Sequence, residues 1–322
     1  MLDTITFASV EAAKSRIANH VRHTPLEKSR WLSSHSEVLL KLECFQITGS
    51  FKIRGAMAKL SALTADEMSR GILTVSAGNH GLAVAHSAET LGLQATIIVP
   101  ETASRAKIRA IERYGVNLIK RGKSYDEAER AARKMERETA MVFVSPYNDP
   151  EVIAGQGTAG IEVMEDFPEV NAIIVPVSGG GLLAGVAIAA KALSPDVKIY
   201  GVEPLATPTM RRALDEGRII EIEEATTIAD GLAGNIESGS ITFPIIQELV
   251  EDIIVVDEQS IRRSIADVAL NDHIIIEGSA ATAVAAIGNR RLRGLRVAAF
   301  ITGRNISLDV FIDAIGAVGA LQ

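Results

Sequence analysis

Short apolar runs alternate with longer helical segments through the middle of the chain, and this alternation constrains the fold more than any other feature. The apolar runs have the length of strands, and the segments between them repeat apolar residues at helical spacing. The runs cover residues 72–75, 95–99, 116–119 and 141–144, and the helical segments cover 79–91, 103–114 and 125–138. Strands separated by about a dozen helical residues form right-handed βαβ units, which predicts a parallel sheet with helices on both faces.

A second set of strand and helix signals flanks this block on both sides. Strands are expected at 38–42, 172–177, 198–203, 253–256 and 296–301. Helices are expected at 9–22, 151–165 and 280–287, and three more are expected of which one ends at residue 193, one begins at 260 and one begins at 307. No internal repeat and no low-complexity linker separates the two sets. We therefore predict an α/β chain of two lobes, in which a small domain of residues 70–148 is inserted in a large domain formed by residues 1–69 and 149–322.

Composition excludes several classes of partner. The 322 residues carry a net charge of −7, which argues against a nucleic-acid surface and an anionic membrane. No apolar run approaches the roughly 20 residues of a membrane span, and the N-terminus lacks the regions of a signal peptide. The single cysteine, Cys44, excludes an internal disulfide and is expected to be a small buried side chain. These features predict a cytoplasmic protein whose partner is a small molecule.

One lysine occupies an unusual place within the stretch from Lys41 to Ala56. Thr48, Gly49 and Ser50 have the chemistry of a turn and a helix cap, so a helix is expected to start near Ser50 with Lys52 in its first turn. A positive charge gains nothing there from the helix dipole, which favours anions at this end. Carbonyl chemistry needs an amine with a lowered pKa, and burial near positive charge supplies one. Lys52 is therefore a candidate catalytic residue.

A glycine loop, Ser178 to Leu182, connects the buried strand at 172–177 to the next helix. Consecutive glycines let backbone N–H groups converge on an anion, and the start of the helix adds its dipole, so a phosphate site is predicted. Gly179, Gly181 and Ala184 also satisfy the dinucleotide pattern G-x-G-x-x-G/A, and Glu203 stands about twenty residues further on, where a ribose-binding acid would be. Taken alone, this region allows a nicotinamide dinucleotide as the alternative cofactor.

Three further segments lie where a strand meets a helix or where a helix begins. Residues 76–81 could hold a carboxylate through their N–H groups and through Ser76, Asn79 and His80, or could simply cap the helix. Thr302 to Asn305 follows the last strand in the same way. Glu277 to Ala280 precedes a helix of small residues, where a capping role is an equal alternative.

The stretch Thr48 to Ala56 resembles the cofactor-lysine motif of the fold-type II pyridoxal-phosphate enzymes, and the closest branch is that of the threonine/serine dehydratases and serine racemases. The resemblance extends from about Thr24 to Asn305 through four motifs in the same order, and it implies a two-lobed fold like that of the tryptophan synthase β chain. It departs from the family at Ser178 and Arg304, where relatives carry glycine. The cofactor-binding residues it implies are Lys52, Phe51, Asn79, Ser178, Gly179, Gly180, Gly181, Leu182 and Thr302. The substrate-binding residues it implies are Ser76, Ala77, Gly78, Asn79 and His80.

The resemblance also implies an activity, the elimination of water from a β-hydroxy amino acid to give a 2-oxo acid and ammonia. Lys52 would bind pyridoxal 5'-phosphate and remove the α-proton, and the neutral hydroxyl of Thr302 would face the pyridine nitrogen. Serine racemases carry a serine where this chain has Ala77, so a dehydratase is favoured over a racemase. L-threonine and L-serine are the expected substrates, and 3-hydroxyaspartate, phenylserine and hydroxyectoine-derived compounds are alternatives.

The family carries three further expectations. Related racemases bind a divalent cation, and Glu203 matches one of its ligands, whereas Thr209 stands where a second carboxylate is expected. The chain ends where the catalytic unit of the family ends, so a catabolic enzyme without a regulatory domain is expected. A homodimer is the expected assembly.

Overall fold

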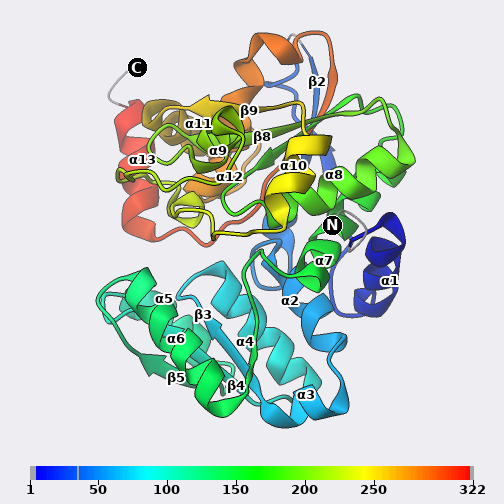
Figure 1. The fold of residues 1–322 in the computed structure, drawn as a ribbon. Helices are drawn as coiled ribbons and strands as arrows, with labels where there is room; N and C mark the ends of the chain where they lie inside the picture. Colours follow the sequence, from blue (N-terminus) through cyan, green and yellow to red (C-terminus); the bar gives the residue numbers. More distant parts are fainter. Residues whose placement is uncertain (1–4, 35, 320–322) are drawn as a thin grey trace.

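The computed structural model describes residues 5–34 and 36–319, which form two sheets with helices packed on them (Figure 1). The strands are β1 (Leu26–Lys28), β2 (Glu37–Lys41), β3 (Ile72–Val75), β4 (Ala95–Val99), β5 (Asn117–Lys120), β6 (Val142–Phe143), β7 (Ala172–Pro176), β8 (Lys198–Pro204), β9 (Asp252–Val256) and β10 (Arg296–Phe300). The larger sheet has the order β1-β2-β10-β7-β8-β9, with β1 antiparallel to β2 and the other pairs parallel. The smaller sheet is parallel throughout and has the order β5-β4-β3-β6.

Helices cover both faces of the larger sheet, as the continuous apolar runs of its strands predict. The helices of the described chain are α1 (Phe7–Ile17), α2 (Lys52–Ser61), α3 (Ala65–Arg70), α4 (Asn79–Leu91), α5 (Arg105–Glu112), α6 (Tyr125–Thr139), α7 (Pro150–Asp166), α8 (Gly181–Leu193), α9 (Thr209–Glu216), α10 (Thr242–Leu249), α11 (Glu258–Asn271), α12 (Gly278–Ala285) and α13 (Leu308–Gly319), with short 3-10 turns at η2 (Glu43–Phe45), η3 (Asp230–Leu232), η4 (Ala286–Gly288) and η5 (Arg290–Leu292). In β7, Ile173 and Val175 belong to the core that contains α7, α8 and α10, whereas Ala172 and Ile174 belong to the core that contains α11 and α12.

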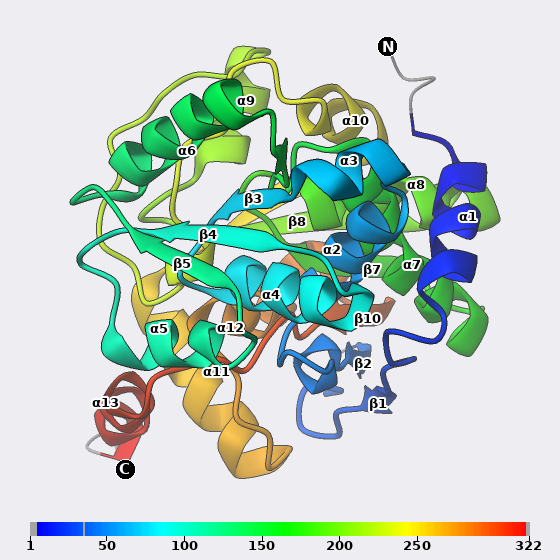
Figure 2. The same cartoon turned by 90° about the horizontal axis from the view of Figure 1, so that it is seen from below.

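The smaller sheet is covered in the same way. Figure 2 shows β3, β4 and β5 side by side, with α6 on one side of them and α4 and α5 on the other. Leu73 and Val75 pack with residues of α6, and Ile97 and Val99 pack with residues of α4 and α5. All four strands of this sheet lie within residues 70–148.

Helix α2 packs on both parts of the molecule. Ile53, Ala56 and Leu60 belong to a core shared with β3 and α4, whereas Met57 and Ala58 belong to the core of the larger sheet. The helix that begins at Lys52 is therefore held between the two sheets, although it precedes residue 70 in the sequence. The domain division at residues 70 and 148 stays a prediction.

The predicted elements agree with the structure except at a few short or terminal segments. The elements at 72–75, 79–91 and 95–99 have the predicted bounds, and Gly92 ends α4 in the left-handed conformation at φ +67°. The bounds predicted for the helix at 9–22 are wrong at both ends, because the helix begins two residues earlier, at Phe7 after the Thr6 cap, and stops at Ile17. The pattern of apolar residues does not reveal β1, α3, α9 or α10, because these elements have three to eight residues each and are too short for a periodic signal. No helix in the described part of the chain is long and apolar enough to cross a membrane.

Candidate active site

Lys52 is the first residue of α2, and its amine points toward the segment between β6 and α7. Its Nζ donates a hydrogen bond to the Pro146 carbonyl at 2.8 Å and lies 5.2 Å from the centre of the Phe51 ring. Burial lowers the pKa of Lys52 to about 8, and the nearby carboxyl of Glu277 acts in the opposite direction. The amine is therefore neutral in a substantial fraction of molecules near physiological pH.

The segment after β10 lies directly beside the start of α2. The Phe51 N–H donates to the Thr302 carbonyl at 3.0 Å, and the Arg304 N–H donates to the Gly49 carbonyl at 2.9 Å. Thr302 is 3% exposed, and its hydroxyl has no hydrogen-bond partner among the described residues. A buried hydroxyl without a partner is costly, so this one marks a place where a polar group of a ligand can bind. Lys52 and Thr302 therefore lie in adjoining segments, and their shared role in one site stays a prediction.

The glycine loop packs against Tyr147, which is the residue after Pro146, whose carbonyl accepts the hydrogen bond from Lys52. A Cβ atom on Gly179 would lie 2.4 Å from two ring carbons of Tyr147, and one on Gly181 would lie 2.9 Å from its Cα. Gly180 caps α8 at φ +88°, a backbone conformation that favours glycine. The first-turn N–H groups of α8 lack partners within the helix, so they can receive an anion. The glycines therefore serve two purposes, the turn itself and space for the Tyr147 ring.

A network of side-chain hydrogen bonds joins the loop at 76–80 to the segment after β10. Asn79 Nδ2 donates to Glu277 Oε1 at 2.8 Å, and Asn305 Nδ2 donates to Asn79 Oδ1 at 2.6 Å and to the Thr48 carbonyl at 2.9 Å. In the same loop, Ser76 Oγ accepts from the Gly78 N–H at 3.1 Å, and Ala77 is half-buried. Asn79 thus faces Glu277 and Asn305 across the boundary between α4 and the larger sheet.

Glu277 belongs to this network of hydrogen bonds. It occupies the N-cap position before α12, but its side chain makes no capping hydrogen bond to that helix, and Oε2 instead accepts from the Asn305 N–H at 3.1 Å. Burial is the main cause that raises the pKa of Glu277 to about 7, and the hydrogen bond from Asn79 opposes it. A Cβ atom on Gly303 would lie 2.4 Å from Glu277 Oε1, so glycine at that position makes room for the carboxyl.

His80 is placed differently from the other predicted substrate-binding residues. Its ring is buried at 4% exposure, and Nε2 lies 3.1 Å from the Val144 carbonyl. Burial and then the charge of Lys52 lower the pKa of His80 to about 3, so the ring is neutral. Its role in binding substrate stays a prediction, while its contact with Val144 connects α4 to the end of β6.

Glu203 is a capping residue in this structure. It is fully buried, and its carboxyl accepts from the Thr209 hydroxyl at 3.2 Å and from the N–H groups of Met210 and Arg211 at 2.8 and 2.9 Å. Burial raises the pKa of Glu203 to about 7. Both oxygens are occupied by the start of α9, which argues against the ribose-binding alternative. Among the described residues no group of three or more His, Cys, Asp or Glu could hold a metal ion, so Glu203 as a metal ligand stays a prediction.

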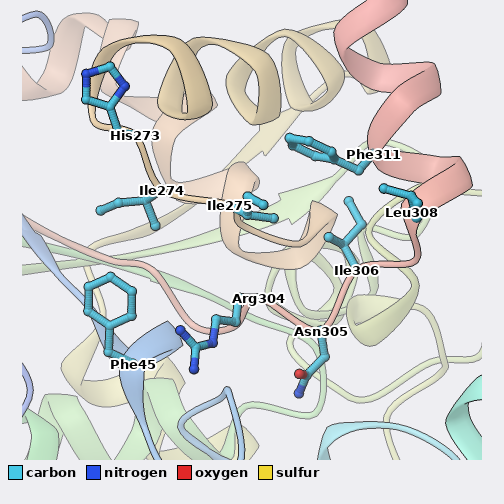
Figure 3. Close-up of a pocket in the computed structure, with 9 residues that line it drawn as sticks. All are labelled: Phe45, His273, Ile274, Ile275, Arg304, Asn305, Ile306, Leu308 and Phe311. Carbon is cyan, nitrogen blue, oxygen red and sulfur yellow. The ribbon is translucent and has the colours of Figure 1, made fainter.

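A cavity of about 530 Å³ lies next to the site on the other side of Asn305. Its lining residues are Phe45, His273, Ile274, Ile275, Arg304, Asn305, Ile306, Leu308 and Phe311. Figure 3 shows the Asn305 side chain pointing away from the apolar side chains of the cavity, and Arg304 lying toward Phe45. Arg304, which replaces a family glycine, thus contacts Phe45 in this cavity with 5.5 Å between the guanidinium carbon and the ring centre.

Sequence reasoning missed three contributors to the site: Pro146, Tyr147 and the side chain of Asn305. Pro146 acts through its carbonyl, which no side-chain pattern reveals. Tyr147 follows β6, and its position at the end of a parallel strand is the one signal that could have identified it.

The comparisons with known proteins agree on one family. The family model described as "Pyridoxal-phosphate dependent enzyme" matches residues 17–303. L-threonine ammonia-lyase of Thermotoga maritima is 40% identical over 314 residues, covering 97% of this chain and 78% of the relative. The catabolic L-threonine dehydratase TdcB of Staphylococcus aureus is 39% identical over 312 residues, covering 94% and 90%. Maize serine racemase superposes with a TM-score of 0.92 at 33% identity and 99% coverage of both chains. The processed threonine deaminase isoform 2 of Solanum lycopersicum gives a TM-score of 0.92 at 32% identity, covering 98% and 88%.

The residues of this site fit pyridoxal phosphate. Lys52 offers an amine of lowered pKa, the glycine loop offers N–H groups at the start of α8, and Thr302 offers a buried hydroxyl without a partner. The dinucleotide alternative for the glycine loop was wrong, because the family match covers most of the chain, including that loop. The chain belongs to the pyridoxal-phosphate dependent enzymes, with the fold-type II architecture.

Proposed function

We propose that the protein is a dehydratase of β-hydroxy amino acids that converts L-threonine and L-serine to a 2-oxo acid and ammonia. The observation that carries the proposal is the Lys52 amine, whose pKa is lowered to about 8 beside the unpaired Thr302 hydroxyl. The names of the relatives at 39–40% identity support threonine as substrate. The catabolic role expected from the sequence belongs to the same proposal.

When bound, pyridoxal phosphate supplies an electron sink for the carbanion at the α-carbon. Lys52 Nζ takes the proton from the α-carbon of the amino acid, because a neutral amine is a base and a protonated one is not. Thr302 Oγ1 would be the neutral partner of the pyridine nitrogen, and a neutral hydroxyl would not hold that nitrogen protonated. The N–H groups of residues 178–182 would hold the phosphate, and Asn79 would hold the 3′-oxygen. The loop from Ser76 to His80 binds the substrate carboxylate.

The structural likeness to maize serine racemase makes racemisation the second candidate. Racemisation requires a second proton donor, and the residue expected to provide it is Ala77, which has no acidic proton. We therefore expect elimination to dominate, and Ala77→Ser to increase the ratio of racemisation to elimination. Measurement of D-serine and pyruvate from L-serine in both variants tests this expectation, and an unchanged ratio would remove residue 77 from the argument.

The first experiment is an absorption spectrum of the protein loaded with pyridoxal phosphate, followed by a 2-oxo acid assay. A visible band that is absent in Lys52→Ala, together with product from L-threonine or L-serine, supports the dehydratase. A band without turnover of either amino acid would keep the cofactor and refute these two substrates. The same assay with 3-hydroxyaspartate and phenylserine then identifies the side chain that the site accepts.

We also propose that the protein is a homodimer in the cytoplasm. Leu308, Ile312 and Ile315 form one exposed apolar stripe on α13, with Ile275 also exposed, and such a stripe supports contact with a second copy. The unpaired buried thiol of Cys44 supports a reducing compartment. Light scattering of the wild type and of Ile312→Glu tests the assembly, and an equal monomer mass in both would contradict it.

A further inference from the structure

Four charged side chains are buried together beneath the start of α2, and we call them the buried charge cluster: Lys41, Glu43, Arg54 and Glu162. Lys41, Glu43 and Arg54 are 0% exposed and Glu162 is 5% exposed. Two positive and two negative charges cancel within the group. Charges so deeply buried are costly unless they are paired with good geometry, so this arrangement needs an explanation.

Arg54 is the centre of the cluster, and all five of its N–H groups have acceptors. Nε and Nη2 donate to the two oxygens of Glu43, both at 2.8 Å. Nη1 and Nη2 donate to the two oxygens of Glu162, both at 2.7 Å. Nη1 also donates to the Thr158 hydroxyl at 3.1 Å. Two bidentate pairs fix the plane of the guanidinium, which a lysine with its single point charge could not do.

The cluster connects elements from distant parts of the chain. Lys41 ends β2, Glu43 begins η2, Arg54 lies in the first turn of α2, and Glu162 lies in α7. Lys41 Nζ donates to Glu162 Oε2 at 2.6 Å and to the Thr24 carbonyl at 2.8 Å. The start of α2 is thus anchored to β2 on one side and to α7 on the other.

Helix geometry makes this anchor relevant to Lys52. Successive residues of an α-helix are rotated by about 100°, so Lys52 and Arg54 point to nearly opposite sides of α2. Phe51, the residue before the helix, provides no side-chain cap. A small rotation of α2 about its axis would therefore carry Lys52 Nζ away from the Pro146 carbonyl, and the two carboxylate pairs of Arg54 oppose such a rotation.

We propose that Arg54 is a positioning residue for Lys52, and that its double carboxylate clamp sets the rotation of α2 that directs the amine into the site. The proposal rests on the proposed function only in taking Lys52 as the amine that binds the cofactor, and it does not depend on the substrate. Lys59 provides a matched control, because its Nζ lies 2.7 Å from Oδ2 of Asp149, the N-cap residue of α7, and so also joins α2 to α7, about one and a half turns beyond Arg54.

The test compares Arg54→Lys with Lys59→Met. Each cofactor-free variant is treated with an amine reagent at a series of pH values, and the reaction of Lys52 is followed by peptide mapping. We expect a midpoint near pH 8 for the wild type and for Lys59→Met, and a midpoint at least ~1 pH unit higher for Arg54→Lys, because the displaced amine regains solvent. Absorption titration should also show binding of pyridoxal phosphate weakened by about tenfold or more in Arg54→Lys alone.

Thermal unfolding separates positioning from a loss of structure. A folded Arg54→Lys protein with the wild-type midpoint and wild-type cofactor affinity would overturn the proposal, and so would equal changes in both variants. If Arg54→Lys does not fold, the double variant Lys41→Met/Glu162→Gln replaces it, since it keeps charge balance and the Glu43 pair but removes the carboxylate that α7 contributes to the clamp; the same criteria apply. The two proposals can fail separately. If the wild type forms no 2-oxo acid but the midpoint of the Lys52 reaction still differs between the wild type and Arg54→Lys, the proposed function is refuted and the role of Arg54 is retained.

Discussion

Gly179→Ala is expected to damage the cofactor site through one neighbour, the Tyr147 ring. The added Cβ would lie 2.4 Å from two of its carbons and 2.5 Å from a third, whereas carbon atoms pack at about 3.5–4.0 Å. The ring or the loop must therefore move by roughly 1 Å. The ring is not free to move, because its hydroxyl accepts from the Glu237 N–H at 2.8 Å and its backbone packs against Gly181.

The size of the effect follows from this crowding. Overpacking of this kind costs about 1–3 kcal/mol, and the preceding carbonyl, that of Pro146, is the one that holds Lys52. If that cost falls on the bound state, affinity for pyridoxal phosphate decreases by roughly 10–100-fold. Absorption titration measures the affinity, and thermal unfolding with and without cofactor measures the stability.

Two controls make this prediction specific. Gly288→Ala is expected to change neither quantity, because nothing lies within 4 Å of the added atom. The double variant Gly179→Ala/Tyr147→Ala should bind more tightly than Gly179→Ala, since the clash is then removed. Wild-type affinity in the single variant, or no recovery in the double variant, would refute the role assigned to the ring.

Three other predictions concern titration and hydrogen bonding. In the cofactor-free protein, Lys52 is expected to react with an amine reagent with a midpoint near pH 8, because burial lowers its pKa, and a midpoint near 10 would show a solvated amine. Thr302→Ala should not destabilise the cofactor-free protein through the loss of a hydrogen bond, because its buried hydroxyl has no partner among the described residues, yet should weaken cofactor binding in the same titration. Glu203 has a folded pKa raised to about 7, so the stability it contributes is present below its unfolded pKa and is lost as pH rises through 7. Denaturation of the wild type and of Glu203→Gln at pH 4.5 and 7.5 measures this effect. Between these pH values the free energy of unfolding of the wild type should fall by about 3 kcal/mol relative to that of the variant, and an equal change in both proteins would contradict the raised pKa.

The order of strands and helices could be predicted because it depends on local patterns. The run at 72–75 and the helix at 79–91 match the structure, since an apolar strand and a helix ended by Gly92 are recognisable within a few residues. The short α9 was not predicted, because its start is stabilised by Glu203, which precedes it by several residues and belongs to a strand. A cap supplied from outside the helix leaves no pattern within it.

The candidate site could be predicted as a set of loops, but their connections could not. The loops after β3, β7 and β10 could each be identified because each follows an apolar strand. β3 belongs to the smaller sheet and β7 and β10 belong to the larger one, so the strand pattern alone does not bring the loops together. Glu277 was an ambiguous residue in the sequence, with capping as an equal alternative. The structure removes this ambiguity, because its carboxyl accepts from Asn79, 198 residues away in the chain.

The sequence by itself determined the α/β class, the glycine turns and the choice of Lys52 as the candidate lysine, because helix periodicity, positive φ angles and motif chemistry act over a few residues. Only the tertiary structure decided how that lysine is tuned and held. Its hydrogen bond reaches Pro146, 94 residues away, and Arg54 reaches Glu162, 108 residues away. Desolvation and buried ion pairing depend on which groups surround a charge in space, and that arrangement exists only once the two sheets have packed against α2.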